Sequence, residues 1–369
     1  MTNLQAIHQL GQSLWYDNMK RSLLTSGGFT QLIQQGIVGV TSNPAIFASA
    51  MGTGTEYDAA LSTLVKQGKS SPKELYEELA IEDIRLAADL FRPVYESSRF
   101  VDGYVSLEVS PHLAHDTAGT LAEAVRLHAR VDRPNLMIKV PATPAGLPAI
   151  TELVSQGICV NVTLLFAVEA YEQVALAYMQ GLEKRMAGGQ PLQQVSSVAS
   201  FFVSRIDTLV DDLLQKKNIA SELAGKIAIA NAYEAYAKYQ ELVSSSRWQA
   251  LHAAGAQSQR LLWASTSTKN PNYPKTKYVD ALIAPHTVNT IPPETVNALL
   301  ESPTSSRTSF TADWSRKLQE ARQQLQALAA SGISLSQVTQ QLLEEAIRKF
   351  ADPFDQLLGT LQSKVEKLA

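Results

Sequence analysis

The stretch "NLMIKVPATPAG" at residues 135–146 has the composition of a buried β-strand with a lysine in its middle. Period-two alternation places Leu136, Ile138 and Val140 on one face and Lys139 on the other. Lysine is rarely buried without a partner, and burial favours its uncharged amine, which is a nucleophile. The alternative is a lysine at a strand end whose ammonium reaches water or a carboxylate, which is commoner for a lone lysine. The rest of the sequence has to decide between the two.

The composition excludes several classes of protein. The 369-residue chain is 45% hydrophobic and 18% charged, as is typical of soluble globular proteins. Its net charge is −3, with no basic stripe for nucleic acid and no apolar run long enough to cross a bilayer. The first 20 residues lack the pattern of a signal or transit peptide, and a single cysteine, Cys159, is typical of a reducing compartment. We therefore expect a cytoplasmic protein that binds neither nucleic acid nor membranes.

Eight strand-like apolar runs alternate with helical patterns, which is the rhythm of a parallel α/β protein. Eight is the strand number of a (β/α)8 TIM barrel, and no repeat or long linker divides the chain. We therefore predict an α/β fold with one domain over residues 1–369, the barrel at about 13–300 and additional C-terminal helices at about 301–369. The predicted strands are 13–18, 36–44, 104–111, 136–143, 159–166, 197–207, 260–268 and 281–292, and the predicted helices include 76–97, 118–131, 167–182, 206–215, 221–243, 293–301 and others within 313–369.

Polar residues recur near the carboxyl ends of these strands, on one face. Ser106 and Glu108 share a face of the third strand, and Asn161 and Thr163 share a face of the fifth. Strands of a parallel barrel are usually apolar on both faces, so a polar set on six strands favours ligand chemistry at the barrel mouth. For any single residue, a hydrogen-bonded polar group at a strand end is an equally good explanation. The other members of the set are Asp17, Asn43, Lys139, Ser200 and Arg205.

Six successive motifs resemble those of the transaldolase family, in the same order. They are "GVTSNPAIF", "SLEVSP", "NLMIKVPAT", "GICVNVTLLF", "SFFVSRID" and "LLWASTSTKNP". The resemblance covers roughly residues 13–300, and the segment "ASTSTKNPNYPKTKYVDALIAP" is most similar to the longer bacterial branch. It implies a transferase without cofactor or metal that moves a dihydroxyacetone unit between sugar phosphates. The expected reaction converts sedoheptulose 7-phosphate and glyceraldehyde 3-phosphate into erythrose 4-phosphate and fructose 6-phosphate, in the non-oxidative pentose phosphate pathway.

The resemblance implies a role for each matching residue. Lys139 matches the Schiff-base lysine, and Asp17 matches the acid–base group that acts on the breaking carbon–carbon bond. Glu108 and Thr163 match a pair that holds a water during imine formation and hydrolysis. A carboxylate near an amine favours the ammonium form and so opposes burial, and the sequence leaves open which effect prevails. The matches expected to hydrogen-bond the bound three-carbon fragment are Asn43, Asn161 and Ser200.

Four further positions concern specificity and phosphate binding. Phe202 matches a position that is Phe in transaldolases and Tyr in the related fructose 6-phosphate aldolases, which favours transfer over release. An aromatic ring that only fills the barrel mouth explains Phe202 equally well. Arg205 matches the family's phosphate arginine, and Lys269 is the nearest candidate for a second cation, two residues later than the arginine of the family's "ASFR". His286 is expected at the mouth, after the eighth strand, without an assigned role.

Two other functions remain open from the sequence. The first is a lyase that releases free dihydroxyacetone, against which Phe202 and the chain length argue. The second is an inactive barrel that serves as a binding scaffold. A scaffold has no need for a buried amine beside carboxylates, so the combination argues against it. The residues concerned are Asp17, Glu108, Lys139, Asn161 and Thr163. The expected partners are sugar phosphates, and the sequence does not distinguish a monomer from a homodimer.

Overall fold

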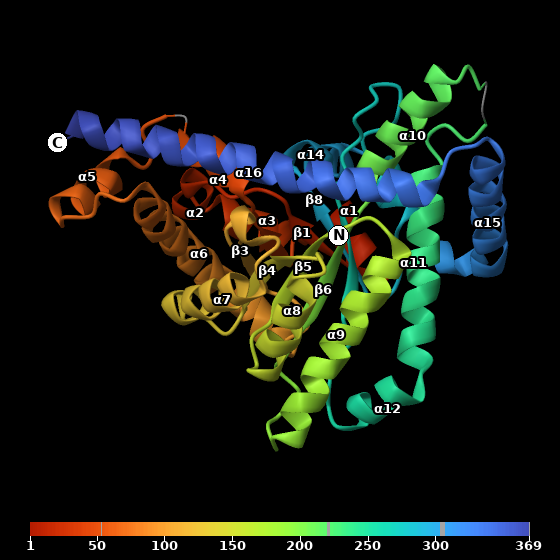
Figure 1. Cartoon of the computed structure of the whole chain (residues 1–369), viewed down its shortest axis with the longest axis horizontal. Coiled ribbons are helices and arrows are strands. Elements are labelled where there is room, and N and C mark those ends of the chain that lie inside the picture. The colour runs from red at the N-terminus through yellow and green to blue at the C-terminus, as the bar shows by residue number, and fades with distance from the viewer. Residues whose placement is uncertain (53, 220–221, 303–306, 369) are drawn as a thin grey trace.

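The computed structural model describes residues 1–52, 54–219, 222–302 and 307–368. Within these ranges, eight parallel strands form a closed barrel in which each strand pairs with the next and β8 pairs with β1 (Figure 1). The predicted (β/α)8 fold is therefore confirmed. The strands are β1 (Gln12–Tyr16), β2 (Gly39–Thr41), β3 (Val105–Glu108), β4 (Leu136–Pro141), β5 (Val160–Leu165), β6 (Ser197–Phe202), β7 (Arg260–Ala264) and β8 (Thr287–Ile291).

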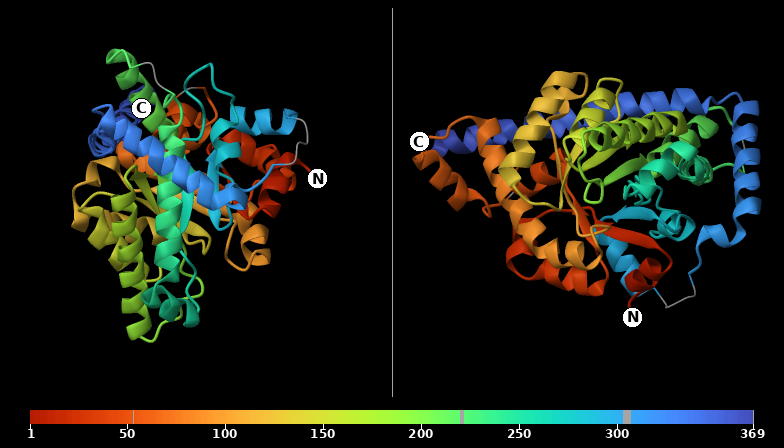
Figure 2. Two further views of the ribbon diagram at one scale, coloured as in Figure 1. Left: turned by 90° about the vertical axis from the view of Figure 1, so that its right-hand side faces the viewer. Right: turned by 90° about the horizontal axis from the view of Figure 1, so that it is seen from below.

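Helices surround the barrel on its outside and extend beyond it at both ends (Figure 2). Those in the first part of the chain are α1 (Asn3–Gln9), α2 (Arg21–Thr25), α3 (Gly28–Gln35), α4 (Pro44–Gly52), α5 (Asp58–Lys66), α6 (Pro72–Ser97), η1 (Pro111–Leu113), α7 (Thr117–Val131) and α8 (Gly146–Ser155). The later ones are α9 (Val168–Ala187), α10 (Ser204–Lys216), α11 (Ile227–Ser244), α12 (Ser246–Ala253), α13 (Lys277–Ala281), α14 (Pro293–Glu301), η2 (Phe310–Asp313), α15 (Trp314–Ala330) and α16 (Leu335–Leu368).

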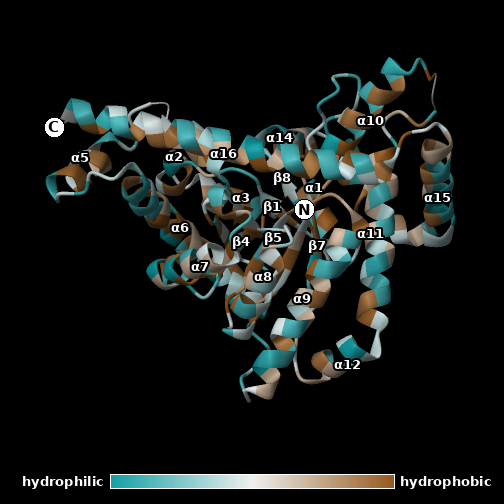
Figure 3. Cartoon of the chain, in the orientation of Figure 1, coloured by the Kyte–Doolittle hydropathy of each residue, from teal (hydrophilic) through white to brown (hydrophobic). Residues whose placement is uncertain are grey.

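The strands owe their burial to helices on one face and to the barrel interior on the other. Every residue of the eight strands is buried. The covering helices are amphipathic, and α10 buries Ile206, Val210 and Leu214, which recur every four residues. Hydrophobic and hydrophilic residues alternate along the helices accordingly (Figure 3). Polar groups inside the barrel are therefore exceptions that need a physical reason.

Helix α16 crosses one end of the barrel (Figure 1). It packs against α4, α6, α10 and η1 and touches β5. Its contact stripe follows helical spacing through Ala346, Phe350, Phe354, Leu357 and Leu361, all of which are buried. The sequence predicts helices in this region but not their position over the barrel mouth. In the described part of the chain, no helix is long and apolar enough to span a membrane.

The structure corrects the position predicted for His286. The predicted run 281–292 is a strand only at Thr287–Ile291, and His286 lies immediately before it. Because all eight strands are parallel, a residue before β8 lies at the amino-terminal end of the barrel, opposite the mouth. His286 is exposed there, with a positive φ of 59° in the turn that enters the strand.

Candidate active site

A cavity of about 270 Å³ opens at the carboxyl ends of the strands. Eight of the ten predicted site residues line it: Asp17, Asn43, Lys139, Thr163, Ser200, Phe202, Arg205 and Lys269. Glu108 and Asn161 do not line it, although both are neighbours of Lys139 in the strand register. A larger hollow of about 510 Å³ lies at the opposite end of the barrel and contains none of the ten. The predicted residues therefore gather at one end, from strands and loops far apart in the sequence.

Lys139 is buried, with 5% of its surface exposed, and it has a carboxylate beside it. Its Nζ lies 3.3 Å from Oε2 of Glu108 and donates to the carbonyl oxygen of Ser42 at 3.4 Å. The register explains the first contact, because Glu108 on β3 pairs with Lys139 on β4 and both side chains point inward. Both readings of the opening stretch thus apply: the lysine is buried, and it is paired.

The two carboxyl groups of the site are held in an environment that disfavours their charge. Burial raises the pKa of Glu108, while the nearby Lys139 opposes the rise and Asp17 adds to it. Burial also raises the pKa of Asp17, again against the effect of Lys139. A raised pKa makes each carboxylate a better proton acceptor than a carboxylate in water, which suits an acid–base catalyst.

Asn161 forms part of a hydrogen-bonded row below the cavity. Its Nδ2 donates to Oγ of Ser106 at 3.0 Å, and its Oδ1 accepts from Oγ of Ser200 at 2.7 Å. The row joins β3, β5 and β6 across the barrel interior and satisfies buried polar atoms. It leaves Ser200 at the cavity wall and Asn161 wholly buried behind it. The structure thus places Asn161 as a support for Ser200.

Thr163 is buried, yet its Oγ1 has no hydrogen-bond partner among the described residues. It lies where β5 becomes irregular, since the pairing with β6 shifts register between Val162 and Leu165. Leu164 in this bulge has a φ of +65°, which is unfavourable for a residue with a branched side chain. Bulges of this kind redirect side chains next to active sites. The unpaired hydroxyl at the cavity wall is a candidate for binding water or substrate.

Asn43 caps a helix with its side-chain oxygen, which leaves its NH2 group available. Its Oδ1 accepts from the backbone N–H of Ile46 at 2.9 Å. This is an N-cap, and Pro44 at the first position of α4 suits such a helix start. The hydrogen bond accounts for the oxygen of the amide, and the NH2 group remains at the cavity, which Asn43 lines.

A cationic end of the cavity is formed by Arg205 and Lys269. The guanidinium of Arg205 stacks on Phe202 at 5.4 Å from the ring centroid, and its buried Nη1 has no hydrogen-bond partner in the described ranges. Burial lowers the pKa of Arg205, and Glu345 opposes that effect. Lys269 is exposed and bonds Oγ of Ser267 at 2.9 Å. A cation with a buried and unused donor atom favours an anionic ligand, and a phosphate can accept several such bonds.

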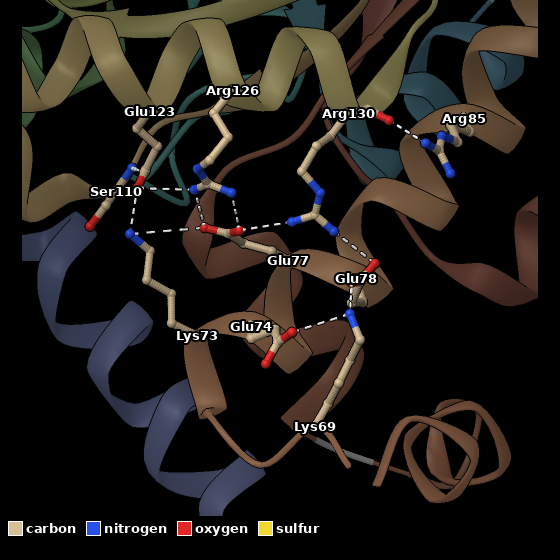
Figure 4. A network of polar contacts seen from close by, with 10 residues as sticks. All are labelled: Lys69, Lys73, Glu74, Glu77, Glu78, Arg85, Ser110, Glu123, Arg126 and Arg130. Carbon is tan, nitrogen blue, oxygen red and sulfur yellow. Dashed lines mark hydrogen bonds and ion pairs between the residues drawn. The ribbon is translucent and has the colours of Figure 1, made fainter. Parts of the chain in front are cut away.

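A network of ion pairs supports the strand end that carries Glu108 (Figure 4). Glu123 on α7 accepts from the backbone N–H of Ser110, two residues after Glu108, at 2.6 Å. Glu77 on α6 accepts two bonds from Arg126, at 2.6 and 2.7 Å, so the two helices are joined next to this loop. The network also includes Lys73 and Arg130. It fixes the loop after β3 and, through the chain, the position of the carboxylate.

The cavity wall also contains residues that the sequence analysis did not select. Thr41 on β2 and Thr290 on β8 belong to the same inward polar pattern, which could have identified them. Lys349 and Phe350 come from α16, and Phe350 lies over the amine, with Nζ of Lys139 5.7 Å from its ring centroid. The hydrophobic periodicity of a sequence does not show which loop or helix will cross the mouth of a barrel. Across the described residues, no cluster of three or more His, Cys, Asp and Glu side chains is arranged to hold a metal ion.

Fold and cavity together define a (β/α)8-barrel enzyme with a buried, carboxylate-paired lysine at its mouth. A model of the family "Transaldolase/Fructose-6-phosphate aldolase" matches residues 14–361. The chain is 46% identical to a transaldolase of Trichodesmium erythraeum over 99% of this chain and 98% of the relative. It is 48% identical to a transaldolase of Thermobifida fusca over 98% of each, and 46% identical to one of Saccharopolyspora erythraea over 99% and 98%. The chain belongs to the transaldolase/fructose-6-phosphate aldolase family.

Proposed function

We propose that the chain is a transaldolase that transfers a dihydroxyacetone unit from sedoheptulose 7-phosphate to glyceraldehyde 3-phosphate. The products are erythrose 4-phosphate and fructose 6-phosphate. One observation carries the proposal: Lys139 is buried beside Glu108 at the wall of a cavity whose other end is cationic. An amine in that position suits attack on a ketone, and the cations suit the phosphate of the same substrate.

The amine of Lys139 attacks the C2 ketone of the donor, and loss of water gives an iminium. Glu108 and Thr163 act on this step. The carboxylate faces the amine at 3.3 Å, and the hydroxyl of Thr163 lacks a partner in the part of the chain that is described. These two groups can hold the water that carries protons when the carbinolamine forms and when the imine is hydrolysed.

Asp17 acts on the carbon–carbon bond. It accepts the proton of the C4 hydroxyl, the C3–C4 bond breaks, and the electron pair moves into the iminium to give an enamine on Lys139. The raised pKa of Asp17 suits a group that must release the same proton in the second half of the reaction. The acceptor aldehyde then takes the enamine carbon by the reverse sequence, and water frees the product.

The enamine has to survive until the acceptor arrives. Asn43 and Ser200 line the cavity and can hold the hydroxyls of the three-carbon fragment, with Asn161 held behind Ser200. Phe202 packs against Phe166 at 5.1 Å between centroids and offers no acidic hydrogen to the fragment. Arg205 and Lys269 bind the phosphates of donor and acceptor. The same proposal places the reaction in the non-oxidative pentose phosphate pathway of the cytoplasm, and the free, buried Cys159 is consistent with a reducing compartment.

Coupled assays of transfer and of release without an acceptor test the proposal. Purified protein should form erythrose 4-phosphate and fructose 6-phosphate in equal amounts from sedoheptulose 7-phosphate and glyceraldehyde 3-phosphate. With fructose 6-phosphate alone, it should release little free dihydroxyacetone. Steady release of dihydroxyacetone without an acceptor, at the rate of transfer, would show a lyase instead.

A further inference from the structure

Helix α16 brings two residues into the active-site cavity that no strand of the barrel supplies. Lys349 and Phe350 line the cavity together with Arg205 and Lys269. Phe350 is buried over Lys139 and fixes this part of the helix against the mouth. One turn further along, Phe354 packs edge-to-face on Tyr76 at 5.3 Å between centroids. The position of Lys349 is therefore set by buried aromatic contacts on the same helix.

Lys349 has a counter-ion on its own helix. Its Nζ lies 3.0 Å from Oε2 of Glu345, four residues earlier, and 59% of the lysine side chain is exposed. Exposed pairs with this spacing contribute little to stability, so the lysine is easily redirected. Glu345 also acts on Arg205, since its charge opposes the lowering of the Arg205 pKa by burial. One carboxylate thus lies under the influence of two cavity cations.

Two other cations of the cavity, Arg205 and Lys269, lie on elements that are hydrogen-bonded to each other. Arg205 lies in the first turn of α10, and Lys269 lies on the loop between β7 and α13. The same loop is bonded to α10 through the hydroxyl of Tyr273, which donates to Oδ2 of Asp211 at 2.7 Å. Lys349 reaches the same cavity on α16, which packs against α10. A phosphate bound between these elements would meet positive charge from α10, from the loop after β7 and from α16.

We propose that Lys349 is a third phosphate-binding residue of the active site and that Glu345 is its counter-ion only while no substrate is bound. A phosphomonoester dianion offers more negative charge and more acceptor oxygens than a single carboxylate. It therefore takes Lys349 from Glu345 and is held by Arg205, Lys269 and Lys349 together. This proposal rests on the proposed function, because it assumes that the substrate carries a phosphate.

Two variants with opposite expected effects test the proposal. Lys349→Met keeps an unbranched side chain, one atom shorter, and removes its charge. It should raise KM for fructose 6-phosphate about fivefold while kcat changes less than twofold. The inhibition constant of inorganic phosphate should rise by a similar factor. Glu345→Gln removes the competitor and should lower both constants about twofold. Each variant has a control on the same helix, Lys367→Met and Glu344→Gln, at exposed positions outside the cavity, and both should match the parent.

A second substrate separates phosphate binding from a general role of the helix. For unphosphorylated fructose, Lys349→Met should have the same KM as the parent. If Lys349→Met and Lys367→Met have equal KM values for fructose 6-phosphate, or if KM for fructose rises as much as KM for the phosphate ester, the proposal is overturned. Failure of the proposed function has a different signature, since the parent protein would then transfer nothing from fructose 6-phosphate.

Discussion

A cation is buried beside a carboxylate at each end of the barrel, but the two ion pairs differ in how fully hydrogen bonds satisfy them. At the amino-terminal end, Arg260 lies 3.0 Å from Oδ1 of Asp102 and also donates to Ser13 Oγ at 2.8 Å. The second oxygen of Asp102 accepts from the same hydroxyl at 2.9 Å. At the mouth, Lys139 and Glu108 lie 3.3 Å apart beside an open cavity.

The difference separates a structural ion pair from a reactive one. The amino-terminal pair is closed, because each charged group has several hydrogen bonds that satisfy it in place. The mouth pair is incomplete, because Oε2 of Glu108 is buried without a hydrogen bond among the residues described. Oγ1 of Thr163 and Nη1 of Arg205, at the wall of the adjoining cavity, also lack partners there. Unpaired buried polar atoms cost stability, and that cost is expected where a ligand supplies the missing bonds.

The largest effects are expected from the mouth carboxylates, and they should differ in kind. Asp17→Asn should reduce turnover by about 10²- to 10⁴-fold, because the proton of the C4 hydroxyl loses its acceptor. It should still accumulate an imine that borohydride traps with the whole ketose attached. Glu108→Gln should instead slow imine formation. Trapping rates measured by intact mass decide the matter, and equal rates in the two variants would mean that the roles are wrongly assigned.

At the amino-terminal end, a change should affect stability and spare chemistry. Asp102→Asn leaves Arg260 buried without its counter-charge and should lower the free energy of unfolding by about 3–5 kcal/mol. Turnover per folded molecule should stay within about twofold of the parent, because the pair lies at the opposite end from the cavity. Urea unfolding and active-site titration measure the two quantities separately. Loss of turnover without loss of stability would contradict the structural role of the amino-terminal pair.

A smaller effect concerns the fate of the enamine. Phe202→Tyr adds a hydroxyl at the cavity wall that can donate a proton or orient water, so release of dihydroxyacetone from fructose 6-phosphate should rise. Transfer to added erythrose 4-phosphate should fall in the same mixture. A barrier difference of about 1.4 kcal/mol changes the product ratio about tenfold. If the variant partitions its products as the parent does, the ring only fills the barrel mouth.

The smallest predicted effect is the gain in stability when the carboxylate of Asp17 is replaced by an amide. The pKa of Asp17 is raised in the folded chain, so its contribution to stability is fully present below its unfolded pKa and is lost as the pH rises through the folded value. Asparagine does not ionise. Asp17→Asn should therefore have a higher melting temperature than the parent at pH 7.5, with the difference shrinking toward pH 4. A difference that is the same at both pH values contradicts the raised pKa.

The eight strands and the inward polar set could be predicted from the sequence, because the alternation of side chains along a strand is a local property. Lys139, Glu108 and Thr163 could be placed in this way, since a parallel register aligns neighbouring strands. His286 was misplaced because the apolar run 281–292 includes a loop before β8, and burial alone does not mark where a strand begins. Strand boundaries are the least certain part of such a prediction.

The contribution of α16 could not be read from its sequence. Its amphipathic pattern shows that one side is buried, but it does not say which surface the helix covers. Lys349 and Phe350 reach the cavity only because α16 packs on elements far away in the chain, such as α4 and α6. The bulge at Leu164 escaped prediction for the same reason, since tertiary contacts hold this unfavourable φ in place.

Borohydride reduction in the presence of fructose 6-phosphate tests the central claim most directly. Intact mass and peptide mapping should show one three-carbon adduct per chain, on Lys139, and none in Lys139→Met. Lys277 provides a matched control, because burial lowers its pKa and its Nζ lies 3.5 Å from the ring centroid of Tyr273, outside the cavity. Lys277→Met should trap as the parent does. An adduct on any other lysine, or no adduct in an active preparation, would contradict the account.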